Sequence, residues 1–248
     1  MGSLAKFSKR ALQTALARRG YRISRFDSCD VLEFLLNALL KSTPGELQLV
    51  QVGANDGVSS DPIYGFITRY PSRVRGVVVE PVKDYFNQLV ENYRHVPGIV
   101  PVNMAIHRHE KEMTIYRVDP LKQKSLPAWT KGIASFNPSH HELGQTPPDA
   151  MIPEKVKCAS LDELLKTHAL TRLDLLQIDT EGYDAEIIDG IDFNVTRPRI
   201  VRFEHGRLRS MSKETFQHIR ARLHGAGYEL MIEPFDVTAY QPDIILDL

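Results

Sequence analysis

Small clusters of acidic, amide or glycine residues follow directly after short apolar runs in this 248-residue chain. Carboxylates can accept hydrogen bonds from hydroxyl groups, a histidine can take up a proton, and glycines let the backbone approach a ligand closely. Parallel strands end at one shared edge of a sheet, where ligands bind. We therefore expect one binding site at that edge, formed by Gly53 to Gly57, Glu80, Asn103 to Ala105, Asp179 to Gly182, and Glu204 with His205.

The glycine loop indicates the kind of ligand. A dinucleotide-binding loop has the pattern G-x-G-x-x-G, which lets the backbone touch a pyrophosphate. Here Asn55 stands at the second glycine and Asp56 adds a carboxylate, which would repel pyrophosphate and favour a cation without phosphate. S-adenosylmethionine fits, because it carries an ammonium, a sulfonium and an adenosine. Glu80, 23 residues after Gly57, is placed to accept both ribose hydroxyls, a contact that a nicotinamide cofactor could also use.

The elements that must position these residues alternate between strands and helices. Apolar runs predict strands at 47–52, 76–79, 99–106, 113–118, 173–178, 199–203, 228–232 and 244–248, with helices at 83–93, after the capping box Ser160–Glu163, and at 212–226. The alternation predicts an α/β fold, an open and mostly parallel sheet with helices on both faces. About ten residues separate the last two strands, too few for a crossover helix, so we expect an antiparallel hairpin there.

The first 46 residues differ from the rest. Residues 1–26 contain seven Lys and Arg side chains and no acid, and their apolar residues fall near one helical face. Such a helix could pack on the domain, lie weakly on an anionic membrane surface or act as a transit peptide. Asp30 is expected to cap a second helix, 31–40, which stops at Thr43-Pro44-Gly45. We therefore divide the chain into an amino-terminal helical extension, 1–46, and a main domain, 47–248.

Composition excludes several classes of protein. Lys plus Arg and Asp plus Glu both total 31, and this net charge of zero argues against a general nucleic-acid binder. No apolar run approaches the roughly 18 residues that span a membrane, so a cytoplasmic location is expected. Cys29 and Cys158 lie far apart and match no metal spacing, so we expect no metal site. A homodimer is compatible with the sequence.

Six stretches of the sequence match the pattern of a known group: Val50–Gly57, Val78–Pro81, Val102–Ile106, Ser160–Leu164, Leu176–Asp184 and Pro198–Glu204. In this order they resemble the FkbM-type family of S-adenosylmethionine-dependent methyltransferases, in the class I methyltransferase superfamily. The Ile-Asp-x-Glu-Gly block at 178–182 is the most specific of them. The resemblance implies a Rossmann-like, mostly parallel seven-stranded sheet with an antiparallel last strand, and O-methylation of a sugar or secondary-metabolite hydroxyl. One departure is Gln177, where the family often has lysine.

The resemblance also implies roles for individual residues. It places the methionine end of the cofactor against the glycine loop, the ribose on Glu80, the adenine along Asn103 to Ala105, and Asp179 and Glu181 between cofactor and acceptor. The cofactor-binding set that follows is Gly53, Ala54, Asn55, Asp56, Gly57, Glu80, Pro81, Asn103, Met104, Ala105, Asp179 and Glu181. Asp179 and Glu181 could also cap the helix after them, since carboxylates stabilise a helix amino end, and both roles can hold together.

Methyl transfer to an alcohol also requires a base that removes the hydroxyl proton. His205, which follows Glu204 after the predicted strand 199–203, is the first candidate, because a neutral imidazole suits this task; a structural histidine is the alternative. Glu204, which the family motif includes, and Asp179 are further catalytic candidates. His140 could do the same work from the other side of the acceptor.

The segment 117–158 has a composition of its own. It contains six of the 15 prolines and the only tryptophan. A loop of this length is usually a lid, a binding loop or a flexible insertion. The family resemblance favours a lid that binds a small-molecule acceptor through Trp129, Ser135, Phe136 and His140. Two other functions stay open, a nicotinamide-dependent reductase and a non-catalytic cofactor-binding scaffold.

Overall fold

A computed structural model of the chain describes residues 30–127, 130, 132–142, 146–206 and 211–246. The predicted amino-terminal basic helix and Trp129 therefore lie outside the described residues. No helix in the described ranges is both long and apolar enough to cross a membrane.

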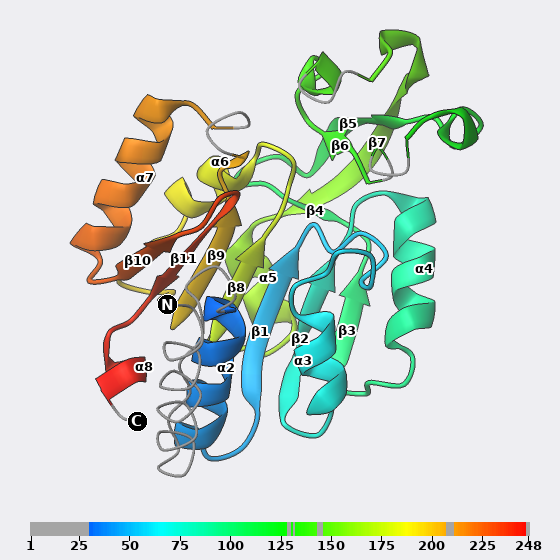
Figure 1. The fold of residues 1–248 in the computed structure, drawn as a ribbon. Helices are drawn as coiled ribbons and strands as arrows, with labels where there is room; N and C mark the ends of the chain where they lie inside the picture. The colour runs from blue at the N-terminus through cyan, green and yellow to red at the C-terminus, as the bar shows by residue number, and fades with distance from the viewer. Residues whose placement is uncertain (1–29, 128–129, 131, 143–145, 207–210, 247–248) are drawn as a thin grey trace, which may run out of the picture.

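A seven-stranded sheet forms the centre of the structure, in the order β10-β11-β9-β8-β1-β2-β3 (Figure 1). Its strands are β1 (Leu47–Val52), β2 (Val74–Val79), β3 (Ile99–Val102), β8 (Leu175–Ile178), β9 (Ile200–Glu204), β10 (Glu229–Ile232) and β11 (Asp236–Tyr240). β11 runs antiparallel to both of its neighbours, and the other pairs are parallel. The predicted Rossmann-like fold with an antiparallel last strand is confirmed.

Helices cover both faces of this sheet, because successive side chains of each buried strand point to opposite faces. Leu49 and Val78 pack toward the helices of one face, α2 (Val31–Ser42), α3 (Tyr64–Arg69) and α4 (Lys83–Tyr93). Val50 and Val77 pack toward those of the other, α5 (Leu161–Thr167), α6 (Asp184–Asp189) and α7 (Lys213–Gly225). Every central strand is thereby buried on two sides and held rigidly, and its carboxyl end is the place where polar residues begin.

Predicted helix caps form at two helices. The Asp30 side chain accepts a hydrogen bond from the backbone N–H of Glu33 at the start of α2, and Ser160 and Glu163 make both bonds of a capping box at α5. Leu35 and Leu39 of α2 are buried in the same core as β1 and β2. The helix that we assigned to an amino-terminal extension thus packs directly on the sheet.

A second sheet, in the order β4-β7-β5-β6, lies beyond the carboxyl ends of the central strands (Figure 1). It contains β4 (Ala105–Ile106), β5 (Glu112–Val118), β6 (Ala134–Ser135) and β7 (Met151–Ala159). Arg117 of β5 is buried; its contact with Asp84 at 3.1 Å joins this sheet to α4, and its contact with Glu154 at 2.5 Å joins it to β7. Segment 117–158 therefore includes ordered strands as well as turns.

Two predicted strands differ from the structure. The strand predicted at 99–106 is two strands in different sheets, because the Asn103 side-chain amide turns the chain by donating to the carbonyls of Glu80 and Pro81, each at 2.9 Å. The strand predicted at 244–248 is wrong: β11 comes earlier, and Asp243–Leu246 is a short helix, α8, preceded by Pro242. A proline just before a helix and an acid in its first turn both favour that outcome. The predicted hairpin is present, formed by β10 and β11.

Candidate active site

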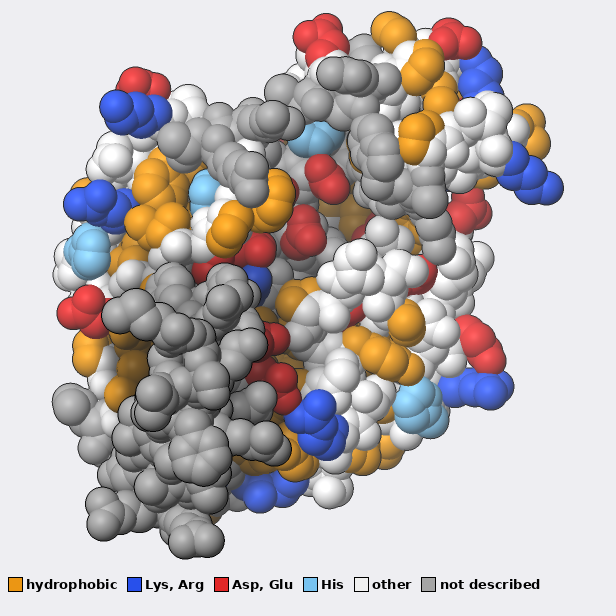
Figure 2. All heavy atoms as spheres, viewed as in Figure 1, with side chains coloured by type: hydrophobic (Ala, Val, Ile, Leu, Met, Phe, Trp, Pro, Cys, Tyr) orange, Lys and Arg blue, Asp and Glu red, His pale blue; other side chains and the backbone are white. Residues whose placement is uncertain are grey.

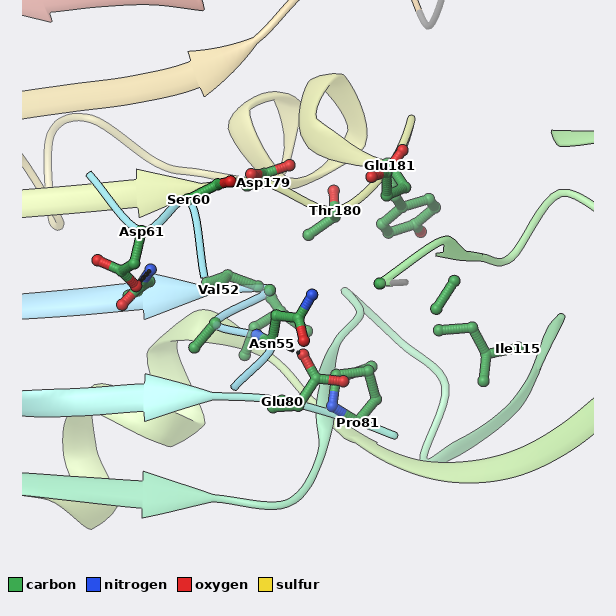
Figure 3. A pocket seen from close by; sticks show the side chains of 18 of the residues that line it. Val52, Asn55, Ser60, Asp61, Glu80, Pro81, Ile115, Asp179, Thr180 and Glu181 are labelled. Carbon is green, nitrogen blue, oxygen red and sulfur yellow. Dashed lines mark hydrogen bonds between the residues drawn. The ribbon is translucent and has the colours of Figure 1, made fainter. Parts of the chain in front are cut away.

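A cavity of about 540 Å³ lies at the carboxyl ends of β1, β2 and β8, between the central sheet and the second sheet. Its size is within the range of small-molecule sites, roughly 300–1,000 Å³. Figure 3 shows Glu80 and Pro81 on one side of it, Asp179 and Glu181 on the other, and Asn55 between them. The predicted site residues that line it are Gly53, Ala54, Asn55, Glu80, Pro81, Ala105, Phe136, Asp179 and Glu181.

The glycine loop enters the cavity through a left-handed turn. Gly53 has φ +79°, and a Cβ atom there would lie 1.7 Å from the backbone oxygen of Asp179, so only glycine fits. The backbone N–H groups of Gly53 and Ala54 donate to the carbonyl of Val79, at 3.0 and 2.9 Å. These bonds attach the loop after β1 to the end of β2, and they place Asn55 above Glu80.

Asp56 and Gly57 shape the loop from outside the cavity. The Asp56 carboxylate accepts hydrogen bonds from the backbone N–H groups of Val58 and Ser59 and from the Ser59 hydroxyl. A side chain at Gly57 would collide with Leu89 of α4. Neither residue lines the cavity, so their expected contact with the cofactor stays a prediction. The Asp56 carboxylate, which we expected to repel pyrophosphate, is hydrogen-bonded within its own loop.

Glu80 is a buried carboxylate held by two backbone donors. Its Oε1 accepts from Val82 N and its Oε2 from Asn55 N, each at 2.8 Å. Burial raises the pKa of Glu80 to about 7, which outweighs the lowering by these two bonds. Each carboxylate oxygen keeps a further lone pair that a ligand hydroxyl could use.

Of the predicted segment Asn103 to Ala105 after β3, Ala105 lines the cavity, and cofactor contacts of Asn103 and Met104 stay a prediction. Asn103 uses its amide to hold the backbone at Glu80 and Pro81, and Met104 packs on the core between the sheet and α5. Ala105 lines the cavity, together with Ile106. Together with Pro81 and Ile115 they give this part of the cavity an apolar lining, which we call the apolar slot.

Asp179 and Asp184 are close in sequence and differ in their partners. The buried Asp184 carboxylate accepts from the backbone N–H and hydroxyl of Thr180 and from the backbone N–H of Glu204, so it ties the loop after β8 to β9. The Asp179 side chain opens to the cavity, and no described residue donates a hydrogen bond to it. Enclosure by protein raises its pKa well above the usual range, and the charges of Asp184 and Glu181 add to that effect.

Glu181 is held by two residues of segment 117–158. His140 Nε2 lies 2.9 Å from Glu181 Oε2, and the Ser135 hydroxyl donates to the Glu181 backbone oxygen at 2.8 Å. Both residues are buried, and the acceptor contact that we predicted for Ser135 and His140 stays a prediction. Phe136 lines the cavity and packs edge-on against Tyr183, with 5.0 Å between the ring centroids.

A comparison with models of known protein families finds a match that includes the residues of this cavity. The family model described as the methyltransferase FkbM domain matches residues 51–230. The chain belongs to the FkbM methyltransferase family. It is therefore a methyltransferase, and its cofactor is S-adenosylmethionine. No curated protein sequence matches the chain.

A comparison with solved structures finds matches at low sequence identity. A METTL16 methyltransferase domain is 11% identical, with a TM-score of 0.45, and the match covers 84% of this chain and 66% of that one. Precorrin-6y C5,15-methyltransferase from Geobacter metallireducens is 12% identical, with a TM-score of 0.39 and coverage of 88% and 93%. Aeropyrum pernix fibrillarin, solved with natively bound S-adenosylmethionine, is 11% identical, with a TM-score of 0.38 and coverage of 84% and 73%.

The cavity of this FkbM family member fits the cofactor chemically. The Asn55 Oδ1 atom is buried and has no donor among the described residues, so it is available to a ligand N–H or O–H group. Glu80 offers lone pairs to hydroxyls, and the apolar slot beside it offers a surface for an adenine. Asp179 and Glu181 supply negative charge on the opposite side, which suits a cation. Among the described residues, no group of three His, Cys, Asp or Glu could hold a metal ion.

Glu204 and His205 lie outside this cavity. Glu204 lines a separate pocket of about 80 Å³ with Asp184 and Ser212, and burial, together with the charges of Glu181 and Asp184, raises its pKa to about 7. The His205 ring is buried against Phe216, and its Nε2 donates to the backbone oxygen of Glu233 at 3.0 Å. The expected catalytic role of His205 stays a prediction. In the structure its side chain and backbone contact Glu233 and Phe235 in the β10–β11 hairpin.

Sequence reasoning missed one side of the cavity. Gln51, Ser60 and Asp61 line it, and Gln51 Nε2 donates to Asp61 Oδ2 at 2.7 Å. Burial raises the pKa of Asp61. A polar residue inside the apolar run 47–52 was a usable signal for Gln51, since a buried glutamine requires a partner. Nothing in the sequence around Ser60 marks a site, whereas Tyr183, which also lines the cavity, lies inside the family-matching stretch Leu176–Asp184.

Proposed function

We propose that this chain transfers the methyl group of S-adenosylmethionine to a hydroxyl oxygen of a small molecule such as a sugar or a secondary metabolite. The observation that carries the proposal is the division of one enclosed cavity into a side suited to the cofactor, around Glu80, and a side with an oriented carboxylate, Glu181. An alcohol requires a base for its proton, and a carboxylate held by a hydrogen bond meets that need.

The charge at this edge supports a small acceptor. Figure 2 shows Asp and Glu side chains gathered in the hollow between the central sheet and the second sheet. A nucleic acid carries a phosphate charge at every nucleotide and is attracted by Lys and Arg. An acidic hollow disfavours such a partner and favours neutral or cationic acceptors.

The residues of the chain divide the work as follows. The cofactor, when bound, supplies an electrophilic methyl group on a positively charged sulfur. Gly53 and Asn55 hold its methionine end, Glu80 accepts its ribose hydroxyls, and the slot between Pro81 and Ile115 encloses the adenine. The second sheet covers the cavity beyond the strand ends and keeps water away from the reacting atoms. Most of the rate enhancement comes from holding acceptor oxygen and methyl carbon in line, since fixed orientation contributes roughly 7–11 kcal/mol in well-placed pairs.

Two measurements test this proposal. Thermal unfolding should show that S-adenosylmethionine and S-adenosylhomocysteine raise the melting temperature and that NAD does not. A panel of methyl glycosides and polyols, each with its amino analogue, should then be assayed for uptake of radiolabelled methyl. We expect label on hydroxylated compounds. Stabilisation by NAD alone would favour the reductase, and label only on amines would replace O-methylation by N-methylation. Cofactor binding with label on no compound would favour the non-catalytic scaffold.

A further inference from the structure

Five carboxylates crowd the edge at which an acceptor would meet the cofactor: Asp179, Glu181, Asp184, Glu204 and Asp236. Three of them are committed elsewhere. Asp184 accepts two hydrogen bonds from Thr180 and one from the backbone N–H of Glu204, and Asp236 pairs with Arg202 at 2.8 Å. Glu204 faces the smaller, separate pocket. Asp179 and Glu181 are the two that line the main cavity.

These two carboxylates differ in what surrounds them. No described residue donates a hydrogen bond to Asp179, so no contact among the described residues orients its carboxylate. A general base must be positioned at the proton that it removes. Glu181 receives a hydrogen bond from the imidazole of His140, which fixes the direction of its carboxylate. Glu181 is therefore the better positioned proton acceptor of the pair.

The chain also holds Glu181 in a strained position. Its φ of +52° is in the left-handed region, which is unfavourable for a residue with a side chain, and Gly182 follows with φ +100°. Strain of this kind costs on the order of 1–3 kcal/mol and persists where surrounding contacts determine the conformation. Here the contacts are the Ser135 hydroxyl on the backbone oxygen and His140 on the carboxylate, and both donors are buried.

We propose that Glu181 is the catalytic base and that His140 is the positioning residue that orients it, so that the second sheet completes the acceptor site. The acceptor oxygen forms its bond to the methyl carbon as the methyl–sulfur bond breaks, the sulfur keeps the electron pair, and the hydroxyl proton passes to Glu181. The inference rests on the proposed function.

The chain offers a matched control for this pair. His218 Nε2 lies 3.0 Å from Asp189 Oδ1 on the surface, where both side chains are half exposed. That pair has the same chemistry and lies away from the cavity. Glu181→Gln and His140→Gln can therefore be compared with Asp189→Asn and His218→Gln, using the first hydroxyl acceptor that the radiolabel panel identifies.

The expected result separates chemistry from binding. Glu181→Gln should lower kcat about 10²–10⁴-fold, the usual contribution of a general base. His140→Gln should lower kcat roughly tenfold or more and leave KM nearly unchanged, because an undirected carboxylate still accepts a proton. S-adenosylhomocysteine affinity should stay within about twofold in both variants, and the control pair should match wild type.

A pH profile and a spectroscopic measurement complete the test. His140, Asp179, Asp184 and Glu204 all face Glu181, so the fall in rate with acid must be assigned by mutation. The acid limb should vanish in Glu181→Gln and persist in Glu204→Gln. The imidazole ¹⁵N resonances of His140, recorded with S-adenosylhomocysteine bound, should shift in Glu181→Gln and remain in place in Asp189→Asn.

Three results would overturn the inference: wild-type kcat in Glu181→Gln, an acid limb that disappears in Glu204→Gln, or His140 ¹⁵N resonances that do not shift in Glu181→Gln. Each of these can occur in an enzyme that binds the cofactor and methylates a hydroxyl, so the proposed function would survive. Failure of wild type to bind S-adenosylhomocysteine or to label any hydroxylated compound would instead defeat the proposed function.

Discussion

Glu80 and Glu181 are carboxylates on opposite sides of one cavity, and the chain holds them by different means. Both oxygens of Glu80 accept backbone N–H groups, from Asn55 in the loop after β1 and from Val82 two residues further on. Glu181 is held by side chains of the second sheet segment, 41 and 46 residues away. Backbone donors are present whatever the side chains are, whereas side-chain donors depend on single residues. The cofactor side should therefore resist mutation of its neighbours, and the acceptor side should not.

The largest effect on stability and cofactor binding is expected from a substitution of Gly53. Gly53→Ala would place a Cβ atom 1.7 Å from Asp179 O at a φ of +79°, and no side chain can move aside, because the obstacle is backbone. We expect a loss of at least about 4 kcal/mol in the free energy of unfolding, the range of severe backbone conflicts, and no measurable cofactor binding. Chemical denaturation and calorimetry would measure both.

Gly65→Ala is the matched control for that substitution. A Cβ atom at Gly65, in α3, has no heavy atom within 4 Å, so alanine there should be neutral or stabilising by up to about 1 kcal/mol. Equal stability of the two variants would mean that the loop after β1 can move away from β8, and the rigid picture of the cofactor side would fail.

The contrast between local and distant contacts also explains which side of the cavity could be predicted from the sequence. The loop at 53–57 and Glu80 were predictable because a strand end followed by glycine or an acid is a local pattern. The contact between Glu181 and His140 was not, since it requires the second sheet to fold over the edge. The final strand was misplaced because Ile244, Ile245 and Leu246 form an apolar run that suits a strand or a buried helix equally. A terminal antiparallel hairpin forms as predicted, but its second strand is β11, not 244–248.

An intermediate effect is expected at Glu80, and it depends on pH. The pKa of about 7 lies above the usual 4.5, so the stability that Glu80 contributes is complete below about pH 4.5 and is lost as pH rises through 7, by about 3 kcal/mol. Ribose hydroxyls donate to the charged form, so S-adenosylhomocysteine should bind more tightly as pH rises from 6 to 8, with release of a proton. Calorimetry in two buffers of different ionisation enthalpy would measure that proton.

Glu80→Gln should resemble the protonated form at every pH. We expect S-adenosylhomocysteine to bind at least about tenfold more weakly at pH 8, since a charge-assisted bond contributes roughly 1.5–3 kcal/mol, and no pH dependence between 6 and 8. Glu46→Gln, at an exposed position before β1, is the control and should behave as wild type. A variant with wild-type affinity and proton release would show that Glu80 only caps the end of β2.

The smallest effect on catalysis is expected at His205. This residue contacts the β10–β11 hairpin and lies outside the main cavity. Its Nε2 donates to the backbone oxygen of Glu233 and its Nδ1 is buried without a donor among the described residues, so neither nitrogen reaches the main cavity. His205→Ala should lower kcat less than about threefold, far below the roughly 10²–10⁴-fold effect of losing a general base.

The cost of His205→Ala should appear in stability instead. The variant loses one hydrogen bond and part of the packing on Phe216, together about 1–3 kcal/mol of unfolding free energy, and leaves S-adenosylhomocysteine affinity unchanged. Denaturant titration and steady-state kinetics on the same preparation separate the two effects. A fall in kcat of a hundredfold at unchanged stability would move the base from Glu181 to His205. It would also mean that the hairpin opens during turnover, because the imidazole reaches the acceptor only if it leaves the Glu233 carbonyl.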